Sequence, residues 1–429
     1  MFRKISIIII SLLLFTVCQK SESKDQHDLS VFGLNSVATN PNSNSGSGSG
    51  SPNTNNTGNG PGSNPNPGGG WTPTPDPLDI GEVSPLTNPN ILIPACGNSV
   101  PILEFGGMPN TSSKVDLGNG NVWRIAGSDT SLVMEYDPNL QLWNGARNFN
   151  LSRIRYRHTA SLLNNGKVLI AGGIGWDNQY DYDFLSSVEL VDPNFGGVPQ
   201  VSFGSDMQIP RYGHRSHPLP NGNLLVHGVS NNTDLTQGAE IYNPNSDTWS
   251  FTNPVNFVRV EPMSVLLQDG RVLVAGGWGP TQNADPSKTA EIYNPANNSW
   301  TSVSDLNLPR IDSTAILLAD GKVLVAGGTN ANNGQYISDM EIYDPNTNQW
   351  TTFEMPVSRV EFTMDLLGDG SVLFLAGRND AYVVHNLRYF PNTNTWCRAP
   401  DLQYKRYAQH TSVLPNGSVL VFGGRSTSY

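Results

Sequence analysis

The chain has 429 residues, of which only 14% are charged, with a formal net charge of −11 and a pI near 5.0. An average soluble protein has roughly 25% charged residues. Asn, Ser, Gly and Thr supply the polarity instead, which is typical of short strands joined by turns. The negative charge, with no basic cluster in the sequence, excludes nucleic acid as an expected partner.

The first 17 residues are typical of a secretory signal. Arg3 and Lys4 precede an apolar run, Ile5–Val17, whose 13 residues are too few for a span that needs about 20. The segment Leu14–Cys18 resembles a bacterial lipobox, although Val17 is bulkier than the usual residue before the cysteine. We expect lipidation of Cys18, with plain secretion as the alternative. The expected location is the cell envelope, either the outer membrane or the cell surface.

Residues 18–78 are rich in Ser, Gly, Asn and Pro. Such a composition buries too little apolar surface to offset the entropy of ordering. The sequence therefore predicts a disordered tether over 18–78, a signal peptide over 1–17 and a folded domain over 79–429.

A turn and strand pattern recurs seven times along the folded domain. Each copy starts with Asn or Asp followed by Gly, a pair suited to a type I′ turn in which both residues have positive φ. An aliphatic strand follows and ends on glycine, which suits a close approach of backbones. The turn glycines recur every 46 to 56 residues, at Gly120, Gly166, Gly222, Gly270, Gly321, Gly370 and Gly417.

A strand such as Ser313–Leu318 leads into the turn, and two further strands follow the glycine-ended strand in every repeat except the last. The third resembles Ala290–Pro295 in sequence, and the fourth carries a tryptophan in most copies. These tryptophans are Trp143, Trp249, Trp300, Trp350 and Trp396. The second repeat has none, and we expect Phe203 to replace it. Four strands in about 50 residues predict one blade of a β-propeller.

The terminal Gly-Gly, the Glu-Ile-Tyr-Asp/Asn-Pro strand and the tryptophan resemble kelch repeats, in the bacterial form of the galactose oxidase propeller. The resemblance implies an all-β propeller with four-stranded blades. We expect seven blades, with six as the alternative. The last repeat has two strands before Tyr429, so we expect Ile91–Ile93 and Val100–Phe105 to complete it, because an open blade would expose sheet edges.

The mature domain holds two cysteines, Cys96 and Cys397. Cys96 lies between the two N-terminal strands expected to close the last blade, and Cys397 follows Trp396 in the blade beside it. We therefore predict a disulfide between them, with two buried thiols as the alternative.

The galactose oxidase resemblance implies copper held by tyrosines and histidines, including an adjacent Tyr-His pair. No such dipeptide occurs, and Tyr156–His158 and Tyr407–His410 only approximate it. The loop Asp177–Asp183 is acidic but lacks the glycine and final glutamate of an EF-hand, so a solvated loop is favoured over a calcium site. We expect no metal, no cofactor and no catalytic residues.

An arginine occurs 13 residues before the glycine-ended strand in six of the seven repeats: Arg155, Arg211, Arg259, Arg310, Arg359 and Arg406. In eukaryotic kelch domains, arginines of this segment line a ligand-binding channel mouth, and the resemblance implies the same here. The alternative is that they form ion pairs with neighbouring carboxylates.

The residue two positions later is acidic after three of these arginines, as Glu261, Asp312 and Glu361, and is not acidic after Arg155, Arg211 and Arg406. Residues two apart on a strand point the same way, which predicts a basic arc at the second set. The candidate ligand-binding residues are Arg155, Tyr156, Arg157, His158, Arg211, Tyr212, His214, Arg406, Tyr407 and His410.

The sequence thus predicts an exported, lipid-anchored, monomeric binding module whose ligand is a protein or an acidic glycan. The alternative is a carbohydrate-active or galactose-oxidase-like enzyme.

Overall fold

The computed structural model describes residues 93–105, 113–127, 130–176, 182–194, 197–228, 238–279, 288–330, 333–380, 383 and 385–426. The chain divides into two units, Met1–Pro75 and Asp76–Tyr429, and all described residues belong to the second. The expected signal peptide (1–17), the lipidation site Cys18, the tether (18–78) and most of the acidic loop at 177–183 lie outside the described residues.

The described residues form β-sheets whose strands follow one another in the chain, with one short 3-10 turn, η2 (Gly145–Arg147). The first sheet contains β2 (Ser113–Asp116), β3 (Val122–Gly127), β4 (Thr130–Asp137), β5 (Leu142–Trp143) and β6 (Phe149–Asn150). The next contains β8 (Thr159–Leu162), β9 (Val168–Ala171), β12 (Val188–Asp192) and β13 (Gln200–Phe203). Then come β14 (Arg215–Pro218), β15 (Leu224–His227), β16 (Ala239–Asn243) and β17 (Thr248–Phe251).

The later sheets repeat this order. They are β18 (Met263–Leu266), β19 (Val272–Ala275), β20 (Ala290–Asn294) and β21 (Ser299–Val303), then β22 (Thr314–Leu317), β23 (Val323–Ala326), β26 (Asp339–Asp344) and β27 (Gln349–Glu354). The next has β28 (Thr363–Leu366), β29 (Val372–Leu375), β30 (Leu387–Phe390) and β31 (Thr395–Arg398). The last contains β32 (Arg406–Val413), β33 (Val419–Ser426) and β1 (Ile102–Glu104). Two small additional sheets pair β7 (Arg155–Tyr156) and β11 (Tyr182–Phe184) with β10 (Ile174–Trp176), and β24 (Thr329–Asn330) with β25 (Gln335–Tyr336).

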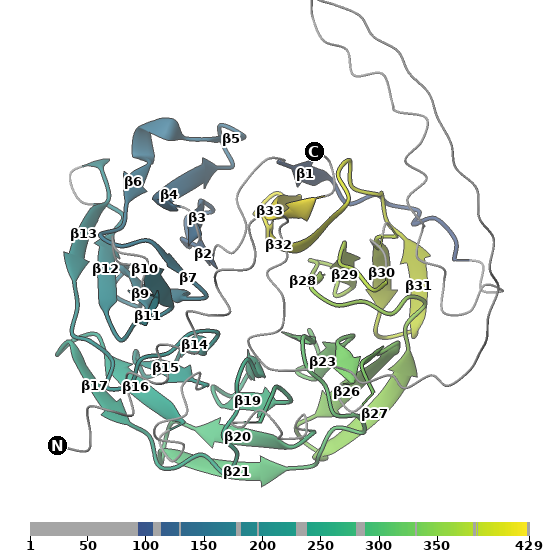
Figure 1. The fold of residues 1–429 in the computed structure, drawn as a ribbon. Helices are drawn as coiled ribbons and strands as arrows, with labels where there is room; N and C mark the ends of the chain where they lie inside the picture. Colours follow the sequence, from purple (N-terminus) through teal and green to yellow (C-terminus); the bar gives the residue numbers. More distant parts are fainter. Residues whose placement is uncertain are drawn as a thin grey trace, which may run out of the picture. The chain divides into compact units, whose positions relative to one another are not determined.

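The sheets stand around a common centre, with β13, β17, β21, β27 and β31 on the outside (Figure 1). The first strands of neighbouring sheets contact one another in a closed cycle: β2, β8, β14, β18, β22, β28, β32 and back to β2. This cycle and the outward order of strands within each sheet define a β-propeller, as predicted. The blade number of seven stays a prediction.

The turn between the first two strands differs from the expected type I′ turn. Gly321 has a positive φ of 85°, whereas Asp320 does not have a positive φ. The Asp320 side chain accepts a hydrogen bond from the amide of Lys322 at 3.2 Å, and Leu318 exchanges backbone bonds with Gly321 and Lys322. This pattern is that of a three-residue loop ending in a left-handed glycine, in which the acidic or amide side chain satisfies the turn backbone.

The paired glycines at the strand ends allow neighbouring sheets to approach, as expected. A Cβ on Gly327 would lie 2.3 Å from the carbonyl oxygen of Arg359 in the next sheet. The adjacent Gly328 donates its amide to that same oxygen at 3.0 Å. Any larger residue at Gly327 would push the two sheets apart.

The apolar core lies between neighbouring sheets. The second strands β9, β15, β19, β23 and β29 are buried along their whole length. One cluster joins Leu324 and Met340 of one sheet to Met364 and Phe374 of the next. Each sheet is therefore stabilised mainly by its two neighbours.

The fourth strands place Trp249, Trp300, Trp350 and Trp396 opposite a tyrosine of the third strand. In the second repeat the corresponding pair is Val191 and Val201. The prediction that Phe203 replaces the tryptophan is wrong, because Phe203 lies two residues beyond that register and is 74% exposed.

The N-terminal strand joins the last sheet, but not in the expected way. β1 pairs with β33 in parallel register, and the described part of this sheet has three strands rather than four. Ile93 is not part of this sheet. Two residues later, Ala95 forms a parallel bridge with Arg398 on β31, so this part of the segment lies along the neighbouring sheet. Ile91 and Leu92 lie outside the described residues.

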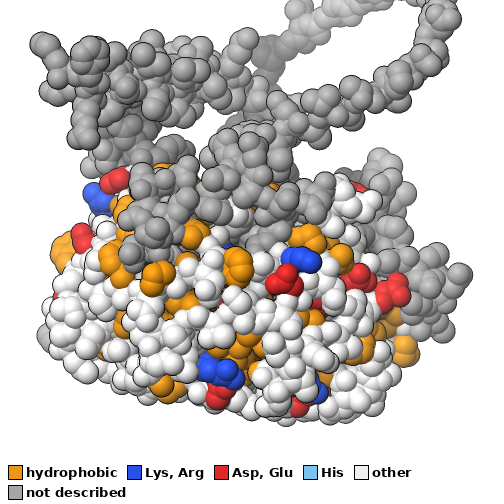
Figure 2. Space-filling view, turned by 90° about the horizontal axis from the view of Figure 1, so that it is seen from below, with side chains coloured by type: hydrophobic (Ala, Val, Ile, Leu, Met, Phe, Trp, Pro, Cys, Tyr) orange, Lys and Arg blue, Asp and Glu red, His pale blue; other side chains and the backbone are white. Residues whose placement is uncertain are grey.

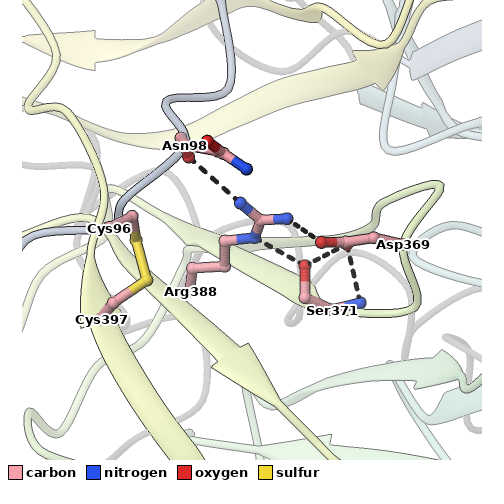
Figure 3. The surroundings of a disulfide bond; sticks show 6 residues. All are labelled: Cys96, Asn98, Asp369, Ser371, Arg388 and Cys397. Carbon is pink, nitrogen blue, oxygen red and sulfur yellow. Dashed lines mark hydrogen bonds and ion pairs between the residues drawn. A yellow bond between two sulfur atoms is a disulfide. The ribbon is translucent and has the colours of Figure 1, made fainter.

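A disulfide connects Cys96 to Cys397, the pairing expected from the sequence. Figure 3 shows a second connection beside it, where the Arg388 guanidinium donates to the Asn98 carbonyl at 3.3 Å and also binds Asp369 and Ser371. The N-terminal segment is thus fastened to one sheet by the disulfide and to the next by β1.

Charged side chains are sparse on the face shown in Figure 2, where they occur as a few separate spots among hydrophobic side chains, uncharged side chains and backbone. Within the described residues, no helix is long and apolar enough to cross a membrane.

Candidate functional site

The six repeated arginines lie just before the first strands, or at the start of the first strand for Arg406, and are almost completely buried, with at most 3% of each exposed. Each uses one terminal nitrogen to bind the carbonyl oxygen of the residue 17 positions later, at the end of the second strand. These bonds join Arg155 to Gly172, Arg211 to Gly228, Arg259 to Gly276, Arg310 to Gly327, Arg359 to Ala376 and Arg406 to Gly423.

Five of the six arginines have a carboxylate partner. The N–O distances are 2.8 Å for Arg155–Glu189, 3.0 Å for Arg211–Glu240, 3.6 Å for Arg259–Glu291, 2.9 Å for Arg310–Glu341 and 2.7 Å for Arg406–Glu104. Glu104 belongs to β1 and lies opposite Val421, the register that Glu341 has opposite Val325. The N-terminal strand therefore supplies the carboxylate that a regular third strand would have supplied.

The expectation that Arg155, Arg211 and Arg406 lack a counter-charge is wrong. Their carboxylate partners belong to the third strand of the sheet or to β1. These residues are far from the arginines in the sequence, so the residues that immediately follow each arginine do not reveal them. The expectation also failed because the residue two positions after each arginine has a positive φ, 55° at Arg157, 62° at Gly213 and 54° at Ala408. A positive φ interrupts the regular alternation of a strand, so two residues on either side of it need not point the same way.

Arg359 is the exception among the six. The register that holds glutamate elsewhere holds Leu387 here, and no carboxylate of a described residue forms an ion pair with Arg359. Its guanidinium donates to the carbonyl oxygens of Ala376 and His385 and lies 5.7 Å from the Phe362 ring centre. Burial lowers the pKa of Arg359 to about 9.

The predicted histidines connect neighbouring sheets. His158 is 7% exposed and its Nε2 lies 2.6 Å from Ser113 Oγ, while His214 is 1% exposed with Nε2 2.9 Å from Thr159 Oγ1. Burial and the nearby Arg155 lower the pKa of His158 to about 3. Burial, with Arg211 next, also holds the pKa of His214 well below its usual value. Both are neutral at pH 7.

The remaining candidates differ in exposure. Tyr212 is buried and stacks on Phe184 at 4.9 Å, whereas Tyr156, Tyr407 and His410 are half-buried. The Arg378 guanidinium lies 5.2 Å from the Tyr407 ring centre. Arg157 is exposed and forms a 2.5 Å ion pair with Glu261. Ligand binding by these residues stays a prediction.

A second ring of residues follows the buried arginines two positions later, and we call it the inner rim. It consists of Arg157, Gly213, Glu261, Asp312, Glu361 and Ala408, all with φ between 50° and 62°. Non-glycine residues in this region are uncommon and often lie at functional sites. Backbone bonds join neighbours directly, from Gly213 to the Arg157 carbonyl and from Ala408 to the Glu361 carbonyl.

The inner rim carries charges of both signs. Glu261 pairs with Arg157 and Glu361 pairs with Arg378, whereas no ion pair joins Asp312 to another described residue. Asp312 is exposed to solvent, but the surrounding protein still desolvates its carboxylate. This desolvation, followed by repulsion from Glu261 and Glu361, raises the pKa of Asp312 to about 6. The sequence had suggested that Glu261, Asp312 and Glu361 neutralise Arg259, Arg310 and Arg359. Within the described residues, none of these three acids forms an ion pair with those arginines.

Comparisons with known proteins agree with this fold. The Kelch motif family matches residues 261–307 and 314–353. Kelch-like protein 25 of Xenopus tropicalis is 24% identical over 202 residues, covering 46% of this chain and 34% of the relative. Human Kelch-like protein 23 is 25% identical over 280 residues, covering 64% of this chain and 45% of the relative. The matched stretches span between a third and a half of these two relatives.

A solved structure of a fungal alcohol oxidase of the AA5 family, in complex with copper, resembles the fold with a TM-score of 0.58. It is 15% identical, and the match covers 80% of this chain and 72% of the other. At this identity the likeness concerns the fold alone. Together, the strand order and the motif match show a β-propeller that contains kelch repeats, and these relatives agree with it.

Proposed function

We propose that this kelch propeller is a binding module and that the inner rim is its contact surface for a protein partner. The observation that carries the proposal is the set of charged residues at the inner rim. Glu261, Asp312 and Glu361 have positive φ on three consecutive sheets, and Arg157 and Arg378, which are exposed or half-buried, pair with Glu261 and Glu361. Kelch-like relatives support an interaction role. Charges of both signs suit a partner segment that itself carries both.

The acidic ligand expected from the sequence rested on arginines without counter-charges. Because these arginines are paired and buried, a mixed-charge protein segment is the better match to the inner rim. An acidic glycan would meet three carboxylates there, and like charges at an interface are unfavourable.

The test is affinity purification of the full-length chain from its own cell envelope, identification of the bound protein and measurement of its affinity for variants. Asp312→Asn and Glu261→Gln should each weaken binding about fivefold or more. Asp305→Asn removes an exposed carboxylate that pairs with Lys288 rather than with a residue of the inner rim, and it is the matched control. Rim variants that bind as tightly as the unchanged chain would place the contact surface elsewhere.

We further propose that the module acts as a monomer at the cell envelope, attached through lipid on Cys18 and extended by the tether over 18–78. The lipobox-like segment and the composition of the tether support this. Cys18→Ser should move the protein from the membrane fraction to the soluble fraction and abolish labelling with a fatty acid. A soluble unchanged chain would favour plain secretion.

The second candidate is a copper oxidase, which the structural neighbour favours through its fold. Within the described residues, no group of three or more His, Cys, Asp or Glu side chains is arranged to hold a metal ion, so the residues present there do not fit a copper centre. We expect metal analysis of the purified protein to find no stoichiometric copper. Copper at one equivalent, with oxidation of sugar alcohols, would overturn the binding proposal.

A further inference from the structure

Neighbouring sheets are joined at their outer edges by a repeated pair of hydrogen bonds. In the first kind, the indole N–H of the fourth-strand tryptophan binds the preceding sheet, from Trp249 to the Ser205 carbonyl, from Trp300 to Thr252 Oγ1 and from Trp350 to the Ser304 carbonyl. In the second kind, an Asp or Asn with positive φ accepts a backbone amide of that preceding sheet. These bonds run from Ser205 to Asp247, from Asn253 to Asn298 and from Ser304 to Asn348.

The junction between β27 and β31 departs from this pattern. By strand register, Trp396, Asn394 and Glu354 occupy the positions of Trp350, Asn348 and Ser304. Within the described residues, neither bond to Glu354 is formed. A physical reason is that β27 continues to Glu354, paired with Asp339, whereas β21 ends one position earlier, at Val303. The longer strand keeps the Glu354 backbone in its own sheet.

A groove of about 360 Å³ lies where the two bonds are missing. Its lining includes Trp396, Asn394, Thr395 and Glu354, with apolar contributions from Met355 and Pro356. Ile93 and Pro94 also line it, and they lie just before the Ala95–Arg398 bridge and the Cys96–Cys397 disulfide. The volume is within the range of small-molecule sites, about 300–1,000 Å³.

The polar groups at this groove are complementary to a hydroxylated ligand. Within the described residues, the Trp396 indole N–H and the Glu354 carboxylate have no hydrogen-bond or ion-pair partner. Asn394 Oδ1 accepts from the Tyr389 hydroxyl at 3.2 Å, which leaves its amide nitrogen as a donor. A hydroxyl group both donates and accepts, so one ligand bearing several hydroxyls can satisfy the carboxylate, the indole and the amide together.

Other ligand classes match the groove less well. An ammonium group has no acceptor for the indole N–H or the amide, and an anion would be repelled by Glu354. The apolar side chains of Ile93 and Pro94, which are half-buried and exposed, can contact the C–H face of a ring. We propose that this groove binds a neutral sugar unit, independently of the protein partner at the inner rim.

The test uses the full-length protein with glucose, galactose and N-acetylglucosamine as separate probes, by saturation-transfer difference NMR and tryptophan fluorescence. At least one sugar should bind at millimolar concentration. Glu354→Ala and Trp396→Phe should each weaken that binding about tenfold, since each removes a hydrogen-bonding group.

Trp350→Phe is the matched control, because its indole N–H is already bound to Ser304. It should lower the stability while leaving sugar affinity unchanged, whereas Trp396→Phe, with no such bond to lose, should change the stability less. The absence of saturation transfer from all three sugars would overturn the proposal, and so would equal losses of affinity in Trp350→Phe and Trp396→Phe. Crystals grown without sugar that show the chain's own preceding residues in the groove would also overturn it.

Discussion

The buried arginines differ in what their removal would leave unpaired. Arg310 faces Glu341, and both side chains are 0% exposed. Arg359 is equally buried but faces only two carbonyl oxygens and an aromatic ring. Breaking a buried ion pair from one side leaves a charge without compensation, whereas replacing a charge that has no carboxylate partner does not.

We therefore expect Arg310→Met to lower the free energy of unfolding by about 3–5 kcal/mol. Arg359→Met should lower it by less, about 1–3 kcal/mol, since only carbonyl oxygens lose a partner. Urea denaturation at pH 7 measures both. Equal losses would mean that the Glu341 carboxylate contributes nothing to the difference.

Buried histidines make the stability depend on pH. The pKa is lowered to about 3 in His158, mainly by burial, and lies well below the usual value in His214 and His227 for the same main cause. In the unfolded chain these groups take up protons near pH 6.5. Their stabilising contribution is therefore complete above pH 6.5 and is lost as the pH falls toward the folded-state values.

Stability should fall between pH 6.5 and pH 5 by about 1.4 kcal/mol per pH unit for each such histidine. Asp312 acts in the opposite direction, because its pKa is raised to about 6, and it offsets part of the slope. Chemical denaturation at pH 7, 6 and 5 provides the measurement. A His158→Gln variant should show a shallower slope, and an unchanged slope would contradict this assignment.

At the scale of the elements, the contact between one sheet's glycine and the next sheet's carbonyl controls the spacing of the sheets. A Cβ on Gly327 would lie 2.3 Å from Arg359 O, and Gly327 also has a φ of +62°. We expect Gly327→Ala to lower the melting temperature strongly, with a loss of about 2 kcal/mol or more from the backbone conformation and the collision together.

Gly368 is the control for this substitution. A Cβ there would meet nothing within 4 Å, and its φ is not positive. Gly368→Ala should leave the stability unchanged or raise it slightly, because alanine restricts the unfolded chain. Similar melting temperatures for the two variants would show that the sheet contact at Gly327 is not limiting.

At the scale of the whole domain, closure depends on residues far apart in the sequence. The disulfide spans 301 positions, β1 pairs with β33, and Glu104 binds Arg406 and the amides of Gln403 and Tyr404. These contacts all come from one short N-terminal segment.

Deleting residues 79–107 should therefore abolish cooperative unfolding, whereas deleting 25–75 should leave the melting temperature unchanged. Cys96→Ser with Cys397→Ser keeps the strand and should cost about 2–5 kcal/mol. Calorimetry distinguishes these cases. A sharp transition after removal of 79–107 would show that the ring does not need β1.

The sequence by itself determined the propeller, because the repeated glycines, the Glu-Ile-Tyr strand and the tryptophans depend on contacts that recur locally in every copy. It also indicated the N-terminal closure and the cysteine pairing, since Cys96 and Cys397 are the two cysteines of the predicted folded domain, 79–429. The six arginines were found, but their environment was not.

Only the tertiary structure decided which charges are satisfied and which are exposed. Arg155 meets Glu189 across its own sheet and Arg406 meets Glu104 from the other end of the chain, pairings that no short window of sequence contains. The positive φ at Arg157 and Ala408 reverses the direction that strand alternation predicts. The two hydrogen bonds that are not formed between Glu354 and the sheet of Trp396 are a further example. We attribute their absence to one extra residue of strand pairing at Glu354, because hydrogen bonds between sheets depend on where each strand ends.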